Sequence, residues 1–179
     1  MLDIAVVGGG LFGSIIARAF EGRNVAVFDD AQPTAGSRPA ACLLKPSWYS
    51  SLGKEVYQPS LKLLDEFYGV ADLRFATRLG KVVVHWCDPK QILQPPTHRV
   101  RVSSVTRRND SFVVRADKEY LAKTVIVTAG IWTPLLVPML GTRLIGQAGV
   151  AFLWPEETVE KPFIKVWAPY RQLVVFNRG

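Results

Sequence analysis

Three glycines near the start of the chain have the spacing of a nucleotide-binding turn. Gly8, Gly10 and Gly13 form the pattern G-x-G-x-x-G directly after an apolar, β-branched run at residues 4–7. In a strand–turn–helix unit the first glycine makes the turn, the second lets the backbone approach a pyrophosphate, and the third allows close helix packing. The helix N-terminus then offers N–H groups and a partial positive charge to the phosphates. This pattern predicts a dinucleotide site.

An acidic residue follows at the distance that such a site requires. A second strand is expected at residues 24–28, and it ends at Asp29, with Asp30 beside it. A carboxylate at this place, about twenty residues beyond the glycines, can accept hydrogen bonds from the ribose hydroxyls. The combination favours a nucleotide site over a structural glycine turn in some other βαβ unit.

The composition is that of a globular chain with an excess of positive charge. Of 179 residues, 49% are hydrophobic, and no apolar run approaches the roughly 20 residues that span a bilayer. No secretory signal is expected, and Cys42 and Cys87 lack metal-ligand or C-x-x-C spacing, which fits free thiols in the cytoplasm. The net charge of +7 suggests either a polyanionic partner or a surface that favours solubility.

Elements that could position the site can be predicted from periodicity. Gly, Pro and Ser mark residues 30–39 as a loop, and apolar spacings of three and four predict a helix over residues 51–68 with a break around Pro59. Strand-like runs at residues 73–77 and 81–86 predict a small antiparallel element.

The most basic stretch is predicted to be a hairpin. Residues 98–108 alternate as a strand does, and a turn at residues 109–110 leads into residues 112–115. Because alternate residues of a strand point to one face, arginines two apart would form a basic stripe. Such a stripe is either a partner surface or simply a solvated strand face. The basic surface expected here includes Arg99, Arg101, Arg107 and Arg108.

Residues 123–130 are typical of a buried parallel strand. They are rich in β-branched residues, end in small ones, and are expected to return beside the first strand. Trp132 follows at the carboxyl end of this strand, where open α/β sheets bind ligands. Further strands are expected at residues 163–167 and 173–176.

Taken together, these segments resemble the D-amino-acid oxidase and glycine oxidase family of FAD-dependent enzymes. The matching parts are residues 6–13, Asp29, residues 36–46 and residues 125–132. The last of them, a strand that ends in a small residue, Gly, any residue and Trp, is more specific than the glycine pattern.

The resemblance implies an α/β fold in two parts. A discontinuous Rossmann-type FAD-binding domain is expected at residues 1–69 and 96–142, and a small antiparallel β substrate-binding element at residues 70–95 and 143–179. The chain is shorter than the usual family member and ends before the Trp-x-Gly-x-Arg-Pro segment, which supplies the arginine for the substrate carboxylate. We therefore expect a shortened member, a fragment, or a chain completed by a second subunit.

The resemblance also assigns residues to the cofactor FAD. The glycine turn and Asp29 would hold the pyrophosphate and the adenosine ribose, a loop after the second strand would line the flavin, and Val102 would meet the adenine. The residues implied at the cofactor are Gly8, Gly10, Leu11, Phe12, Gly13, Asp29, Asp30, Ser37, Arg38, Ala41, Leu44, Val102, Ala129, Gly130 and Trp132.

Candidates for the chemistry itself come from residue type and position. Lys45 could lie beside the flavin and favour its reaction with dioxygen, or lie on the surface. Arg171 and Arg178 could clamp a substrate carboxylate. No metal site is expected.

The activity that the resemblance implies is FAD-dependent oxidation of a CH–NH or CH–NH2 group, with dioxygen as the acceptor. The loop at residues 36–46 also resembles the flavin domain of the bifunctional tRNA wobble-uridine enzyme. With the charge of +7, this favours a glycinyl amine carried on a modified thymidine or uridine, as in hypermodified phage DNA, cleaved to an aminomethyl base and glyoxylate.

Three alternatives remain at this point. One is an oxidase of free glycine, sarcosine or D-amino acids, and another is a non-catalytic or partner-completed flavin-binding subunit. The third is a nicotinamide-dependent dehydrogenase, which Asp29 would suit but which the strand ending at residues 128–132 does not favour.

Overall fold

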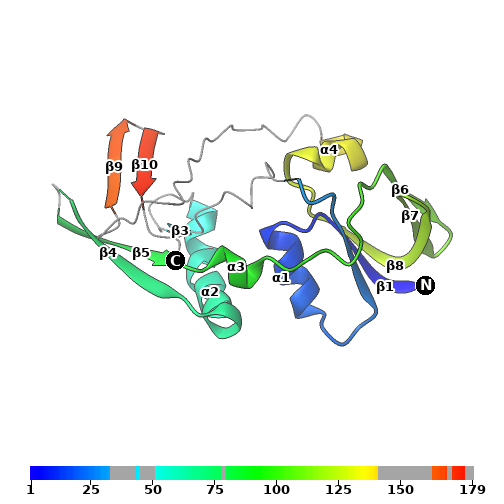
Figure 1. Ribbon diagram of the computed structural model, residues 1–179, viewed down its shortest axis with the longest axis horizontal. Coiled ribbons are helices and arrows are strands. Elements are labelled where there is room, and N and C mark those ends of the chain that lie inside the picture. Colours follow the sequence, from blue (N-terminus) through cyan, green and yellow to red (C-terminus); the bar gives the residue numbers. More distant parts are fainter. Residues whose placement is uncertain (33–42, 45–50, 78–79, 141–162, 169–170, 176–179) are drawn as a thin grey trace. The chain divides into compact units, whose positions relative to one another are not determined.

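The computed structural model describes residues 1–32, 43–44, 51–77, 80–140, 163–168 and 171–175 (Figure 1). The chain divides into two compact units, of which the first comprises residues 1–41 and 88–149 and the second residues 42–87 and 150–179. The division that the sequence predicts at residues 69 and 96 stays a prediction. In the structure, residues 42–69 group with the second unit.

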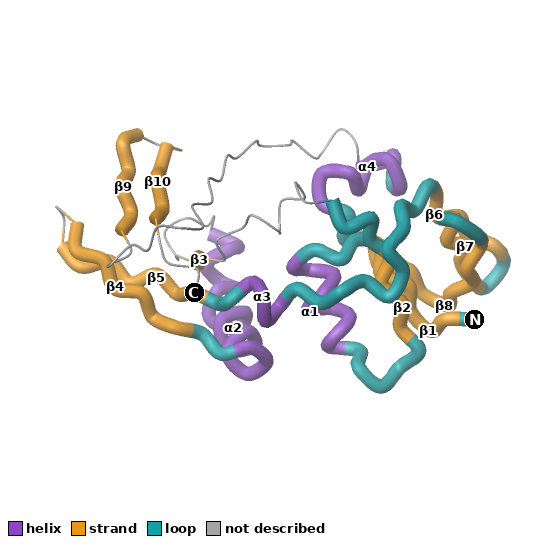
Figure 2. Tube along the Cα trace, viewed as in Figure 1, coloured by secondary structure: helices purple, strands orange, loops and turns teal. Residues whose placement is uncertain are grey.

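A five-stranded sheet forms the first unit, with the strand order β2-β1-β8-β7-β6. Its strands are β1 (Leu2–Val7), β2 (Val25–Phe28), β6 (Ser104–Arg108), β7 (Ser111–Arg115) and β8 (Glu119–Val127). Strand β1 pairs in parallel with both β2 and β8, whereas β6, β7 and the first half of β8 form an antiparallel meander. Figure 2 shows these strands in orange beside the purple helix α1.

Alternation along β1 sends its side chains to two cores. Helix α1 (Leu11–Ala19) packs on one face, where Ile16 and Ala17 contact the buried Ile4 and Val6. Ala5 and Val7 point to the other face and join the larger core cluster. The short helices of this unit are α3 (Pro89–Ile92), η2 (Gly130–Trp132), α4 (Thr133–Leu136) and η3 (Pro138–Leu140). The period of two in the sequence thus gives β1 a packed core on each of its two faces, as expected for an α/β unit.

The strand predicted from residue 98 begins later than expected. Strand β6 starts at Ser104, because its pairing with β7 starts there. Ser104 pairs with Arg115, the last residue of β7, and Arg108 pairs with Ser111, the first. The residues before β6 extend to the opposite edge of the sheet instead. There His98 forms a parallel bridge with Phe28, and the Val100 N–H donates to the Asp29 carbonyl at 3.0 Å.

Strand β8 is parallel to β1 as predicted, but it is not buried as predicted. Ala122 is fully buried, whereas Lys123 and Thr124 are exposed and Val125 is half-buried. The reason lies in the pairing: β7 pairs with β8 only as far as Ala122, and beyond it β1 is the one partner strand among the described residues.

The second unit contains the predicted antiparallel strands. Strands β3 (Leu43–Leu44), β4 (Ala71–Thr77) and β5 (Gly80–Trp86) form a sheet in the order β3-β5-β4. Strands β9 (Phe163–Ala168) and β10 (Arg171–Val175) form a separate antiparallel pair. The predicted strands at both places are confirmed, although the described strands make two sheets rather than one.

The predicted helix of this unit is present without the expected break. Helix α2 (Ser51–Tyr68) continues through the exposed Pro59, because a proline inside a helix can kink it rather than end it. It ends before Gly69, whose φ is +72°, and the next residue, Val70, donates its N–H to the Asp65 carboxylate at 2.8 Å. In the part of the chain that the structure describes, no helix is long and apolar enough to cross a membrane.

Candidate nucleotide-binding site

Only glycine fits at two positions of the turn between β1 and α1. Gly8 has φ +107°, and a Cβ atom on it would lie 2.5 Å from the Thr128 carbonyl oxygen. A Cβ atom on Gly13 would lie 1.8 Å from the Gly8 carbonyl oxygen. The turn and the first turn of α1 therefore approach each other too closely for any side chain. The tight turn and close packing predicted from the spacing are both present.

Helix α1 points a positive end toward this turn. It is nine residues long, its N-cap is Gly10, and no side chain caps it. No acidic residue occurs in its first turn. The first N–H groups of a helix have no intrahelical acceptors, and they carry the positive end of the helix dipole. This arrangement suits a phosphate group.

The side chain of Asp29 lies beside the same turn. Its Oδ2 accepts the backbone N–H of Gly9 at 2.7 Å, and its Oδ1 accepts that of Ala31 at 2.7 Å. Both bonds fix the carboxylate at the end of β2. A carboxylate at this place can accept hydrogen bonds from the hydroxyls of a ribose.

Asp30, the next acidic residue, is engaged differently. Its Oδ2 lies 2.9 Å from both Nε and Nη2 of Arg101. The prediction that Arg99 and Arg101 lie on the strand of the hairpin is wrong, because β6 begins at Ser104. Both residues are exposed, and the basic surface predicted for them stays a prediction. Val102, the expected adenine contact, is half-buried and packs against the core cluster.

The carboxyl end of β8 contributes a residue that sequence reasoning missed. The Thr128 hydroxyl donates to the Gly8 carbonyl at 2.7 Å, and no spacing pattern had singled it out. Ala129 is half-buried, Gly130 has φ +56°, and Trp132 is 42% exposed. These three predicted cofactor residues thus follow the carboxyl end of β8. Because β8 is parallel to β1, this is the end of the sheet at which the glycine turn follows β1.

The remaining predicted residues divide between the second unit and the undescribed part of the chain. Leu44 belongs to β3 and Arg171 to β10, and for both the structure describes the backbone alone. Outside the described residues lie Ser37, Arg38, Ala41, Lys45 and Arg178. The predicted flavin loop and carboxylate clamp therefore stay predictions.

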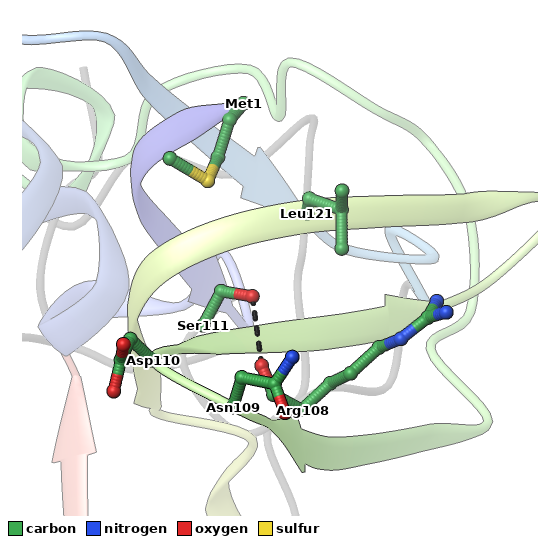
Figure 3. A pocket seen from close by; sticks show the side chains of 6 residues that line it. All are labelled: Met1, Arg108, Asn109, Asp110, Ser111 and Leu121. Atoms are coloured by element: carbon green, nitrogen blue, oxygen red, sulfur yellow. Dashed lines mark hydrogen bonds between the residues drawn. The ribbon is translucent and has the colours of Figure 1, made fainter.

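Two hollows in the first unit lie away from this turn. The first, of about 350 Å³, is lined by Met1, Leu121 and the β6–β7 turn, in which the Ser111 hydroxyl donates to the Arg108 carbonyl at 3.0 Å (Figure 3). The second, of about 330 Å³, also involves Met1. Since Met1 precedes β1 and the glycine turn follows it, both hollows lie at the opposite end of the strand. Neither is a candidate for the nucleotide.

No protein-family model matches the sequence, and the search of curated proteins gives no match. Solved structures do match, over 78% of this chain. They include glycine oxidase from Geobacillus kaustophilus, with 14% identity, a TM-score of 0.56 and 58% of that chain covered. NikD, an unusual amino acid oxidase essential for nikkomycin biosynthesis, has 15% identity, a TM-score of 0.59 and 54% coverage. L-Amino acid deaminase from Proteus vulgaris has 11% identity, a TM-score of 0.54 and 56% coverage.

These similarities concern the fold. The chain spans somewhat more than half the length of these three structures, at 54% to 58% of each. The α/β fold of Rossmann type that the sequence predicts is confirmed, and it is a fold shared with glycine oxidase and amino acid oxidase structures.

Proposed function

We propose that this chain, with the fold of the glycine and amino acid oxidases, binds FAD at the glycine turn and forms the cofactor-binding part of an amine oxidase. One observation carries the proposal: the Asp29 carboxylate is hydrogen-bonded to Gly9 within the turn, next to the N-terminus of α1. A ribose acceptor and a phosphate-binding helix end are thereby held side by side, as a dinucleotide requires.

Each part of the site has a role in this proposal. The N-terminus of α1 binds the pyrophosphate, Asp29 accepts the ribose hydroxyls, and the glycines leave room for the backbone to approach the ligand. Ala129, Gly130 and Trp132 lie along the cofactor at the carboxyl end of β8. FAD, when bound, supplies an acceptor for two electrons. The chain itself positions the cofactor and contributes to excluding water around it.

The proposed reaction is the oxidation of a carbon–nitrogen bond. A hydride leaves the carbon next to the amine nitrogen, dioxygen is reduced to hydrogen peroxide, and water hydrolyses the resulting imine. For a glycinyl amine, R–NH–CH2–COO⁻ with O2 and water gives R–NH2, glyoxylate and hydrogen peroxide. Recognition of the carboxylate requires a cationic side chain, for which Arg171 and Arg178 are the candidates in this sequence.

For the substrate, we propose a glycinyl amine carried on a modified thymidine or uridine of nucleic acid. The support is the net charge of +7 and the exposed Arg107 and Arg108 on the β6–β7 hairpin. The base would have to be unpaired or flipped to reach the cofactor. Among the described residues, ion pairs already engage Arg101 with Asp30, Arg115 with Glu119 and Lys123 with Asp3. Free glycine, sarcosine or a D-amino acid is the alternative, which needs no basic surface.

The absorbance spectrum of the purified full chain with added FAD tests the first part of the proposal. Flavin bands that stay with the protein through gel filtration support it, whereas failure to retain FAD contradicts it. Anaerobic mixing with glycine, sarcosine and an oligonucleotide that carries a glycinyl-modified thymine then tests the substrate. Bleaching by the oligonucleotide alone supports a nucleic-acid amine, and bleaching by free glycine or sarcosine contradicts it. A flavin that none of them bleaches favours a subunit completed by a partner chain.

A further inference from the structure

The peptide unit between Gly8 and Gly9 is held from both sides. Its carbonyl oxygen accepts a hydrogen bond from Thr128 Oγ1 at 2.7 Å, and its N–H donates to Asp29 Oδ2 at 2.7 Å. A trans peptide unit is planar, with its C=O and N–H pointing in opposite directions, so bonds at both ends fix its orientation. We infer that Thr128 is a positioning residue for the nucleotide site. Together with Asp29, it holds this peptide unit in one orientation.

The orientation of this peptide unit has to be fixed by hydrogen bonds because the unit joins two glycines. Neither residue has a Cβ atom to restrict its rotation, and glycine occupies positive and negative φ with similar ease. Rotation of the unit would break its bond to Asp29 and redirect the Gly8 carbonyl oxygen. A carbonyl oxygen turned toward a pyrophosphate would repel it, whereas the observed bond directs that oxygen at Thr128.

Thr128 is placed for this role by the register of the sheet. Its backbone N–H donates to the Val7 carbonyl at 2.7 Å, which continues the pairing of β8 with β1 into the turn. Its hydroxyl is also 3.2 Å from the Val7 carbonyl oxygen, but the contact with Gly8 is shorter. A Cβ atom on Gly13 would lie 2.9 Å from this hydroxyl oxygen. The hydroxyl therefore lies where β1, β8 and α1 meet.

The inference deepens the proposed function and rests on it, since the ligand for which the turn is positioned is the pyrophosphate of FAD. Valine has nearly the shape of threonine but lacks the hydroxyl, so T128V removes the bond with little change in packing. T128S keeps a hydroxyl and removes one methyl group. T124V makes the same chemical change at an exposed threonine of β8, four residues earlier, and is the matched control.

The Kd for FAD is measured by quenching of flavin fluorescence for the full chain and these three variants. Loss of one hydrogen bond is expected to raise the Kd of T128V about three- to tenfold. T128S and T124V are expected to stay within about twofold of the wild type. In a D29A background, T128V should have a smaller effect than in the wild type, because both residues act on one peptide unit.

Hydrogen exchange of the Gly9 amide in the unliganded protein gives a second readout, independent of FAD. We expect faster exchange in T128V than in the wild type, and no such increase in T128S. Unchanged FAD affinity and Gly9 exchange in T128V would overturn the inference. A T128S variant as impaired as T128V would also overturn it, since the methyl group and not the hydroxyl would then matter. If the wild type fails to bind FAD, the proposed function is wrong, while Gly9 exchange still decides whether Thr128 locks the turn.

Discussion

The carboxylate of Asp29 reaches back twenty residues along the chain and accepts the backbone N–H of Gly9 at 2.7 Å. The acidic residue predicted as a ligand of the ribose therefore also supports the turn that is predicted to bind the phosphates. These two parts of the proposed site are coupled, and a change in one is expected to alter the other.

Gly13→Ala tests the packing of the turn against α1. The new Cβ atom would lie 1.8 Å from the Gly8 carbonyl oxygen, so the helix or the turn must move. We expect a loss of about 2–3 kcal/mol in the free energy of unfolding, together with loss of FAD binding. Urea denaturation and FAD titration measure the two effects.

Gly22→Ala is the control for that experiment. No atom lies within 4 Å of its new Cβ atom, but φ is +92°, so the backbone cost alone is tested. We expect this backbone strain to lower the free energy of unfolding by about 1–2 kcal/mol and to leave FAD binding normal. Equal FAD binding by both variants would show that close packing at Gly13 does not position the site.

Phe28→Ala tests the larger core cluster of the first unit. Phe28 is 1% exposed, stacks on His98 with ring centroids 4.8 Å apart, and meets the Tyr120 ring edge-on. Loss of a buried phenyl ring is expected to cost about 3–5 kcal/mol in the free energy of unfolding. Thermal and urea denaturation measure it. Tyr120→Phe keeps the ring and loses only the contacts of the hydroxyl, which donates to Asp117 at 3.0 Å and lies 3.5 Å from His98 Nδ1. A loss as large as that of Phe28→Ala would contradict this account.

Lys123→Gln tests an electrostatic contact between β1 and β8. The hydrogen bond and charge of Lys123, with the bond from Asn24, hold the pKa of Asp3 below its ordinary value of 3.8. A carboxyl group whose pKa is lower in the folded state stabilises the fold at pH values above its pKa in the unfolded state. This stabilisation is lost as the pH falls through its pKa in the folded state. We therefore expect the variant to be less stable than the wild type near neutral pH and equally stable once Asp3 is protonated in both.

A carboxyl NMR titration of Asp3 gives the direct measurement of this effect. Its pKa should rise toward the ordinary value in Lys123→Gln. Lys118→Gln is the control, since Lys118 lies over the Tyr120 ring and is not among the groups that shift Asp3. A pKa of Asp3 that stays unchanged in Lys123→Gln would disprove the assigned contact.

The proposed nucleic-acid substrate is tested through salt dependence. Arg107→Gln combined with Arg108→Gln removes two exposed charges from the β6–β7 hairpin. Each phosphate contact that is lost should make the slope of log K against log salt shallower by about 0.7 on single-stranded oligonucleotides. Fluorescence anisotropy at several salt concentrations measures the slope. Arg101→Gln should change it little, because Arg101 is already paired with Asp30. An unchanged slope in the double variant would argue against this surface.

The sequence by itself determined the local elements and the position of the nucleotide turn. Glycine spacing specified a tight strand–turn–helix unit, and Asp29 followed at the required distance, because both depend on short-range backbone geometry. Periodicity identified α2 and the strands of both units for the same reason. The sequence predicted a break at Pro59 that is not present, since a proline inside a helix can kink it rather than end it.

Only the tertiary structure decided which distant residues meet. Thr128 was not predicted to contact Gly8, which lies 120 residues away, because no local pattern marks the partner of a hydroxyl group. The pairing of Arg101 with Asp30, 71 residues apart, and the start of β6 at Ser104 were missed for a related reason. Alternation predicts a strand but not its neighbour, and the topology of the sheet assigns residues 98–100 to the edge beside β2.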